Sequence, residues 1–365
     1  KNNSLKNLLL EESFYTLDTI IEIKKNYKFS DTYLFNGRHY NYRPILKYLS
    51  SLGDNVYCYD VSNYSERLII SKNEYPHNLI SRAHNLIKIK KLKSNKKLIK
   101  AGKNFFKKRF KENRSNNLID NYEFSQNQSL PKNFDNSKLN ISFFNTALWE
   151  FQSIVENEKY YLFKNDFEFL KFLKFKFKKE KDINFYFRCH PNMVNEKNYL
   201  KKISVILKNF NNLKFIHPES EISTKELIKN SDLIINFGSS VSIEGGYYGK
   251  KIITLAPSIF LYFSFQEIFY SKKNLIVFIK NILKMKKKKM LKLDKKILND
   301  TILAAGCAYY EGLHFNNVKV LDRYKQIYFT NKKKLILRPS FFFNFFYLSL
   351  MSFKAFKRLI NFTFI

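Results

Sequence analysis

Two short segments of the chain carry side chains that could bind an anion. The first contains Gly238, Ser239 and Ser240, which follow an apolar run at 233–237 that is typical of a buried strand. A helix beginning at Ser239 or Ser240 would present free backbone N–H groups and the positive end of its dipole, and both favour phosphate or carboxylate. Glu244, one turn into that helix, could accept hydrogen bonds from ribose hydroxyls. An ordinary capped helix of an α/β domain would have the same residues, so the pattern leaves both interpretations open.

The second segment contains His190 and Pro191, at the end of the strand-like run 183–189. Pro191 ends the strand and restricts His190 to an extended backbone. His190 would then lie at the carboxyl end of a strand, where open α/β folds bind ligands, and could donate to a phosphate. Arg188 would add positive charge if its side chain faced the same crevice. A single histidine more often makes a structural hydrogen bond, but two strand ends directed at one crevice favour a binding site.

Helices and strands alternate along the segments around these residues. Strands are expected at 32–35, 55–61, 139–144, 183–189, 213–216, 233–237 and 252–256, and helices at 17–27, 44–52, 147–155, 160–177, 199–210, 223–229 and from Ser239 or Ser240 to Tyr248. Such alternation favours parallel sheets covered by helices, the α/β class. The polar segment 112–137 is rich in Asn and Ser and is predicted to be an interdomain linker. We therefore expect an N-terminal domain at 1–137, a C-terminal domain at 138–334 and a tail at 335–365.

The composition narrows the class of protein. The 365 residues include 65 Lys or Arg and 31 Asp or Glu, a formal charge of +34, and 17% of them are aromatic, which excludes a disordered polyelectrolyte. Only 10 of the basic residues are Arg, the residue that base-reading proteins prefer, so we expect no specific nucleic-acid partner. Three separate cysteines without a CxxC pair form neither a disulfide framework nor a zinc site, and predict a reducing cytoplasm.

The segment 75–111 is a basic amphipathic stretch. It contains 13 Lys or Arg residues and no acid, with apolar residues interleaved. Two interpretations are open: a solvated helical face, or a surface that contacts anionic lipid or an anionic acceptor.

The tail at 335–365 has ten aromatic residues, four basic residues and no acid. Between Arg338 and Lys354 lie 15 uncharged residues, which as a helix would rise about 22 Å, less than the ~30 Å hydrocarbon core of a bilayer. The tail therefore predicts either an interfacial membrane anchor or a helix that packs on the N-terminal domain. No secretory signal is visible after Lys1, and whether residues precede Lys1 is left open. We expect a cytoplasmic protein that is peripheral at the inner face of the cytoplasmic membrane.

Several of these motifs together resemble bacterial capsule and surface polysaccharide biosynthesis proteins, a group that includes capsule Kdo transferases. The resemblance rests on Arg188-x-His190-Pro191-Asn192, Ser223-Thr224-x-x-Leu227-Ile228, the segment 231–244 and the segment 247–253, and more weakly on Asn36-Gly37-Arg38, Arg43-Pro44 and 144–151. The His-Pro and Ser-Ser elements are also similar to those of bacterial sialyltransferases.

The resemblance implies a GT-B fold, in which two Rossmann-like domains with parallel sheets face each other across a cleft. It implies a glycosyltransferase that moves a sugar from a nucleotide-sugar donor, with a CMP-linked sugar as one option, to a surface polysaccharide or its lipid-linked primer. His190, Ser239 and Ser240 would contact the nucleotide phosphate, and Glu244 the ribose or the donor sugar. No metal and no cofactor are expected, because a helix end and nearby cations would meet the phosphate charge.

The resemblance assigns no catalytic base, because the Asp/Glu-Asp/Glu-Gly motif of sialyltransferases is absent from the sequence. Asp60, at a strand end, and His39 are the candidates, with Asn36 and Arg38 on the acceptor side. A nucleotide-sugar epimerase or polyol-phosphate transferase of related fold is an alternative, and so is a non-catalytic basic protein that binds RNA or membranes. Donor sugar, acceptor and stereochemical outcome are left open.

Overall fold

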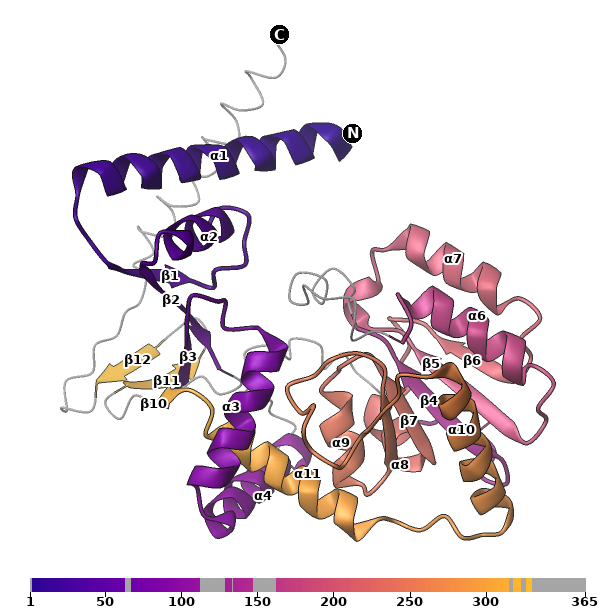
Figure 1. Ribbon diagram of the computed structural model, residues 1–365. Helices are drawn as coiled ribbons and strands as arrows, with labels where there is room; N and C mark the ends of the chain where they lie inside the picture. The colour runs from indigo at the N-terminus through magenta and orange to yellow at the C-terminus, as the bar shows by residue number, and fades with distance from the viewer. Residues whose placement is uncertain are drawn as a thin grey trace.

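The computed structural model describes residues 2–62, 67–111, 129–132, 134–146, 162–314, 318–322 and 326–329. Within these residues the chain forms an α/β fold with two main sheets, one in each half of the molecule (Figure 1). The helix expected at 147–155, most of the linker at 112–137 and the tail at 335–365 lie outside the described residues. The domain boundaries at 137 and 334 stay predictions.

The C-terminal sheet has six strands, all parallel, in the order β6-β5-β4-β7-β8-β9. Its strands are β4 (Leu139–Phe144), β5 (Ile183–Arg188), β6 (Leu213–Ile216), β7 (Leu233–Asn236), β8 (Lys251–Thr254) and β9 (Glu267–Ile268). In chain order this is 3-2-1-4-5-6, the order of the Rossmann fold. The expected α/β class with a parallel sheet is thus confirmed for this half of the chain, and the strand order reverses between β4 and β7.

Helices cover both faces of this sheet. On one face lie α6 (Asp166–Phe177), α7 (Lys197–Leu207) and α10 (Lys272–Lys287), and on the other α8 (Thr224–Asn230), α9 (Val241–Tyr247) and α11 (Lys295–Tyr309). The strand β7 shows why: its residues are all buried, with Leu233 and Ile235 in one apolar cluster and Ile234 in the other. Continuous apolar runs of this kind are typical of a sheet that is covered on both sides.

The basic stretch adds two helices to the second face, α3 (Leu79–Leu92) and α4 (Asn95–Lys111). Leu86, Leu98 and Phe106 belong to the same buried cluster as the apolar side of α11, and α4 lies beside α11 (Figure 1). The apolar side of α4 is therefore covered by protein. The lysines of its outer side are exposed, and we call them the lysine face of α4: Lys96, Lys97, Lys100, Lys103, Lys107 and Lys108.

The N-terminal sheet is mixed, in the order β1-β2-β3-β10. It contains β1 (Asp31–Phe35), β2 (Asn55–Val61), β3 (Arg67–Lys72) and β10 (Leu313–His314), with α1 (Asn2–Asn26) before β1 and α2 (Arg43–Ser51) between β1 and β2. β1 and β2 are parallel, but β3 is antiparallel to β2 and β10 to β3. The expectation of a parallel sheet therefore fails beyond β2, because the short connection from Val61 to Arg67 cannot hold the crossover that a parallel pair needs.

Two contacts join the segment after α11 to the N-terminal half of the chain. After α11 the chain returns to the N-terminal sheet through β10, and the buried Glu311 receives two hydrogen bonds from Arg82 of α3, at 2.9 and 2.5 Å.

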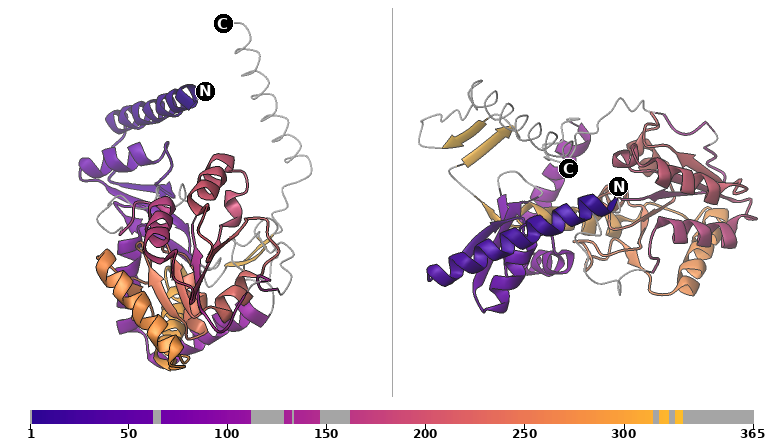
Figure 2. Two further views of the ribbon diagram at one scale, coloured as in Figure 1. Left: turned by 90° about the vertical axis from the view of Figure 1, so that its right-hand side faces the viewer. Right: turned by 90° about the horizontal axis from the view of Figure 1, so that it is seen from above.

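Figures 1 and 2 show α1 over α2 at one end of the molecule and α4 with α11 at the opposite end. A small antiparallel hairpin, β11 (Val318–Asp322) and β12 (Gln326–Phe329), follows β10. Among the described helices, none is both long enough and apolar enough to cross a bilayer.

Candidate functional site

The two segments predicted to bind an anion leave the same edge of the C-terminal sheet. Arg188 of β5 and Asn236 of β7 are both register partners of Phe144 in β4, which lies between them. Neighbouring strands are about 4.8 Å apart, so these two residues are separated by roughly 10 Å. His190 and Ser239 follow them by two and three residues, on either side of the end of β4. This edge is the switch point of the sheet, where such folds bind ligands.

The turn after β7 has a fixed shape. Gly238 has a φ of +70°, and the side-chain oxygen of Asn236 accepts a hydrogen bond from the backbone N–H of Ser239 at 3.0 Å. The hydroxyl of Ser239 accepts from the N–H of Val241 at 3.3 Å, which satisfies one of the first donors of α9. Ser240 is the N-cap residue and is exposed, and its side chain makes no capping bond. The hydroxyl of Ser240 is therefore the group that this turn offers to a ligand.

Two hydrogen bonds hold His190, one through its backbone and one through its ring. Its N–H donates to the side-chain oxygen of Asn145 at 2.7 Å, and its ring Nδ1 accepts from the N–H of Asn192 at 3.2 Å. The backbone is extended, with φ −62° and ψ 136°, as Pro191 requires. Because Nδ1 is the acceptor, the neutral ring carries its proton on Nε2. Nε2 is thus a donor, which is the role predicted for His190 toward a phosphate.

Behind His190 lies a buried polar network that sequence reasoning missed. The amide of Asn145 donates to the carboxylate of Asp166 at 3.2 Å and to the hydroxyl oxygen of Tyr199 at 2.9 Å, and that hydroxyl donates to Asp166. Burial raises the pKa of the Asp166 carboxyl to about 6 and also raises the pKa of Tyr199. In the sequence, this network is indicated only by Asn145, a polar residue directly after the buried strand β4. The network fixes the loop that presents His190.

Arg188 does not face the switch point. The residue is 4% exposed, and Nη1 of its guanidinium donates to the carbonyl oxygen of His217 at 2.7 Å. His217 follows β6, on the side of β5 away from β7. Burial lowers the pKa of this guanidinium. Arg188 therefore lies at the predicted sheet edge, but its hydrogen bond fixes the end of β6.

Glu244 has a structural partner. The side chain is buried, and its Oε1 accepts hydrogen bonds from Nε and Nη2 of Arg109 in α4, at 3.1 and 2.6 Å. The glycines that follow permit close packing: a Cβ at Gly245 would lie 2.4 Å from the side chain of Ile234, and one at Gly246 would lie 2.1 Å from that of Thr301. Glu244 thus belongs to the contact between α9 and α4, and its predicted role toward the ribose stays untested.

In the N-terminal sheet, Asn36 and Asp60 come together with a third residue, His77. Asn36 follows β1 with a φ of +63°, is buried, and donates from its amide to the Asp60 carboxylate. Nε2 of His77 lies 2.9 Å from Oδ2 of Asp60, and the N–H of Val61 donates to Oδ1 at 2.7 Å. Burial alone would raise the pKa of Asp60, but His77, the Val61 N–H and Asn36 outweigh it and lower this pKa. Sequence reasoning missed His77, whose one signal is its place beside the helix cap Asn78.

The other two candidates of this domain lie in the turn before α2. Arg38 is half-buried, and its backbone N–H donates to the side-chain oxygen of Asn36 at 3.3 Å. His39 is exposed, and its carbonyl oxygen accepts from the N–H groups of Tyr42 and Arg43 at 3.0 and 2.8 Å. The structure therefore places Arg38 next to the Asn36 cluster, whereas the ring of His39 is on the surface.

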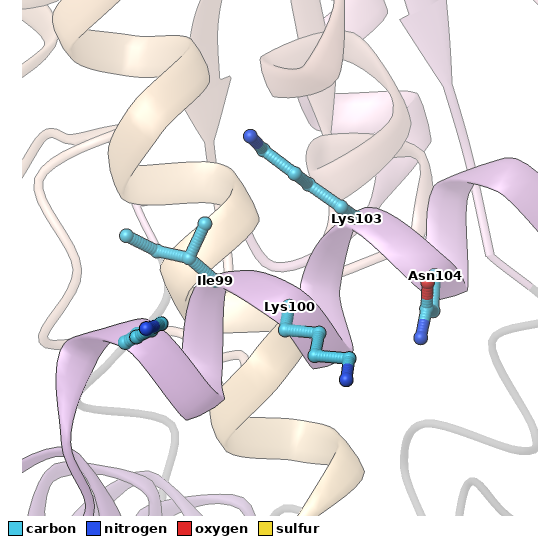
Figure 3. Close-up of a pocket in the computed structure, with 5 residues that line it drawn as sticks. Ile99, Lys100, Lys103 and Asn104 are labelled. Carbon is cyan, nitrogen blue, oxygen red and sulfur yellow. The ribbon is translucent and has the colours of Figure 1, made fainter.

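Two further features concern ligands. Among the described residues, no group of three His, Cys, Asp or Glu side chains could hold a metal ion, and the three cysteines are free and buried. A shallow hollow lies on α4 and is lined by Lys96, Ile99, Lys100, Lys103 and Asn104 (Figure 3). None of these residues belongs to the loops of His190 and Ser240 or to the cluster of Asn36, Asp60 and His77. The predicted independence from metal stays a prediction.

Neither the family models nor the curated proteins contain a match to this chain. Solved structures do: a KpsC β-Kdo 2,7 transferase of Thermosulfurimonas dismutans is 13% identical, with 87% of this chain and 90% of that chain covered and a TM-score of 0.48. The β-Kdo 2,4 transferase of the same organism is 10% identical, with coverages of 76% and 79% and a TM-score of 0.44. A UDP-GlcNAc 2-epimerase of Neisseria meningitidis is 12% identical, with 80% of both chains covered and a TM-score of 0.35. What this chain does must be inferred from its own residues.

Proposed function

We propose that this protein is a glycosyltransferase that moves a sugar from a nucleotide-sugar donor to a capsule or other surface polysaccharide, or to its lipid-linked primer. The observation that supports it is the switch point of the C-terminal sheet, where the loops of His190 and Ser240 flank the end of β4. Nε2–H of His190 and the hydroxyl of Ser240 would donate to the phosphate of the donor. Both hydrogen bonds would strengthen as the nucleotide phosphate gains negative charge on leaving the sugar.

The N-terminal domain would hold the acceptor, with Asn36 and Arg38 beside it. The proposed reaction needs no metal, because protein donors meet the phosphate charge. We also propose that the protein works in the cytoplasm, at the inner face of the membrane, with the lysine face of α4 and the tail at 335–365 as the parts that contact anionic lipid.

Calorimetric titration with CMP, UDP and sugars linked to each nucleotide tests the donor site. We expect the wild-type protein to bind one nucleotide class, and the variants His190→Ala and Ser240→Ala to bind it at least tenfold more weakly, with EDTA without effect. His84→Ala and Ser204→Ala are matched controls, because both residues are exposed and lie within α3 and α7, outside the loops of His190 and Ser240. No nucleotide binding by the wild-type protein, or equal binding by all four variants, would contradict the proposal.

Product analysis distinguishes the enzyme classes. A transferase consumes the donor only when an acceptor hydroxyl or water takes the sugar, whereas an epimerase converts the donor into its isomer without any acceptor. An isomer formed in the absence of acceptor would therefore replace the transferase proposal with the epimerase. Binding to generic polyanions that falls steeply with salt, without preference for nucleotide sugars, would favour a non-catalytic basic protein.

A further inference from the structure

The cluster of Asn36, Asp60 and His77 has the arrangement of an activated histidine. Oδ2 of Asp60 accepts from Nε2 of His77 at 2.9 Å, and the carboxylate also accepts from Asn36 and from the N–H of Val61. These contacts lower the pKa of Asp60 against the effect of burial, so the carboxylate is ionised near neutral pH. An ionised carboxylate on one ring nitrogen holds the proton on that nitrogen and leaves the other with its lone pair.

The second ring nitrogen, Nδ1, is the basic atom in this arrangement. Within the described part of the chain, the hydrogen bond of the His77 ring is made by Nε2, which donates to Asp60. The amide nitrogen of Asn36 lies 3.3 Å from Nε2, but it is a donor to the same carboxylate and makes no hydrogen bond to the protonated Nε2. The His77 side chain is 22% exposed and that of Asp60 is 15% exposed. Both side chains are thus mostly covered, with part of the His77 side chain accessible from solvent.

The place of the cluster in the fold also fits a reaction at the donor. Asn36 and Asp60 lie at the carboxyl ends of β1 and β2, the parallel pair of the N-terminal sheet. His77 precedes α3, and Leu79, the first residue of α3, packs against the apolar cluster of the C-terminal domain that contains Cys189 and Phe237. Those two residues directly precede His190 and Gly238. The start of α3 therefore abuts the domain that carries the proposed donor site.

We propose that His77 is the catalytic base and that Asp60 positions it, an inference that rests on the proposed function. Nδ1 of His77 takes the proton of the acceptor hydroxyl as its oxygen forms a bond to the anomeric carbon of the donor sugar. The bond from that carbon to the phosphate oxygen breaks, and its electron pair leaves with the nucleotide phosphate. The imidazolium that results is stabilised by Asp60 and returns its proton to solvent. Asp60, a base candidate from the sequence, thus acts through His77, and His39 has no part.

Turnover and nucleotide binding measured on the same variants test this role. With water as acceptor, nucleotide release from CMP- and UDP-linked sugars is followed for His77→Gln and for the control His84→Gln, an exposed histidine in α3, the helix that follows His77. We expect His77→Gln to keep the nucleotide affinity of the wild-type protein and to lose turnover by about 10²- to 10⁴-fold, the usual contribution of a general base. His77→Gln with turnover within threefold of wild type and intact binding overturns the inference and leaves the proposed function standing. A wild-type protein that binds no nucleotide overturns both.

A spectroscopic measurement tests the pair without relying on turnover. In ¹⁵N-labelled wild-type protein, NMR correlation of the ring nitrogens should show His77 as the neutral tautomer with its proton on Nε2. Asp60→Asn should shift this tautomer equilibrium and lower turnover by at least tenfold without weakening nucleotide binding. A proton on Nδ1 of His77 in the wild-type protein, or a tautomer unchanged by Asp60→Asn, would overturn the assignment.

Discussion

Arg109 donates from Nη2 to Oε1 of Glu244 over 2.6 Å, so the basic stretch is tied to the helix that begins beside the proposed donor site. Both side chains are largely covered, at 24% and 10% exposure. Glu244→Gln should therefore lower the free energy of unfolding by about 1 to 3 kcal/mol, because Arg109 loses its charged partner while partly buried. Nucleotide affinity should stay within threefold of wild type. Urea unfolding and calorimetric titration measure the two effects.

The control for this substitution is Glu22→Gln, which breaks a pair with Lys25 at 3.3 Å in which both side chains are exposed, at 65% and 68%. Surface pairs of this kind contribute little, so we expect a much smaller change in stability than for Glu244→Gln. A Glu244→Gln variant of unchanged stability that binds nucleotide at least tenfold more weakly would return Glu244 to the donor site and refute the structural assignment.

The helices α4 and α11 meet through glycine. A Cβ at Gly306 would lie 2.0 Å from the carbonyl oxygen of Leu98, and one at Gly102 would lie 1.9 Å from that of Ile302. Alanine normally improves a helix by about 1 kcal/mol over glycine, but backbone atoms at this distance force the helices apart. Gly102→Ala and Gly306→Ala should each lower stability by at least about 1 kcal/mol, measured by urea unfolding. The exposed Lys103→Ala should change it by less than about 0.5 kcal/mol, and a stabilising Gly306→Ala would show that the helices are not in contact.

The order of the elements from β4 to β8 could be predicted from sequence because these strands are short runs rich in apolar residues. The strands Leu139–Phe144 and Leu213–Ile216 lie where the pattern placed them, and Ser223 caps α8, the helix expected at 223–229. The order of strands within the sheet then brings the loops of His190 and Ser240 to one edge, which periodicity alone cannot specify.

Side-chain partners could not be predicted in the same way. Arg109 and Glu244 are 135 residues apart, and only the packing of α4 on α9 brings them together. Asp60 and His77 are 17 residues apart, but the chain between them includes β3, which returns antiparallel and carries the segment after it back along the sheet. The sequence indicated Asp60 as a candidate carboxylate. It did not indicate His77 as its partner, because the turn that brings His77 to Asp60 has no local sequence pattern.

Asp166 predicts a dependence of stability on pH. Its carboxyl is fully buried, and burial raises its pKa from 3.8 to about 6. The folded state therefore holds a proton that the unfolded state releases, so stability is greatest below pH 4 for this group and falls by up to about 3 kcal/mol as the pH rises to 6 and beyond. Asp166→Asn, which cannot ionise, should lack this loss. Urea unfolding of both proteins at pH 4.5 and pH 7 measures the difference.

Asp182→Asn is the control for that experiment. Asp182 is exposed, and Lys287 lowers its pKa through a hydrogen bond and its charge, so its contribution to stability has the opposite sign, being lost as the pH falls. If wild type and Asp166→Asn lose equal stability between pH 4.5 and pH 7, Asp166 is already ionised in the folded protein at pH 4.5. That result would contradict the raised pKa of Asp166.

The proposed membrane contact makes a prediction about the lysine face of α4. The apolar side of α4 is packed on α11, so this helix cannot insert, and its attraction to anionic lipid would be electrostatic only. Each lysine near an anionic surface contributes about 1 kcal/mol. Reversal of Lys96, Lys100 and Lys103 to Glu should therefore weaken binding to vesicles of mixed neutral and anionic lipid by at least 10²-fold at low salt. The effect should largely disappear in 0.5 M salt, where charges are screened within about 5 Å.

The tail and the lysine face can be separated in the same pelleting assay. Deletion of residues 335–365 should abolish binding if the aromatic tail is the anchor, and equal pelleting of the truncated protein would leave the lysine face as the remaining contact. Reversal of Lys201, Lys202 and Lys208 to Glu, three exposed lysines around α7, changes the net charge by the same amount at another place. If this control weakens binding as much as the change on α4, the protein is attracted by its total charge, and α4 is no more a membrane contact than any other basic surface.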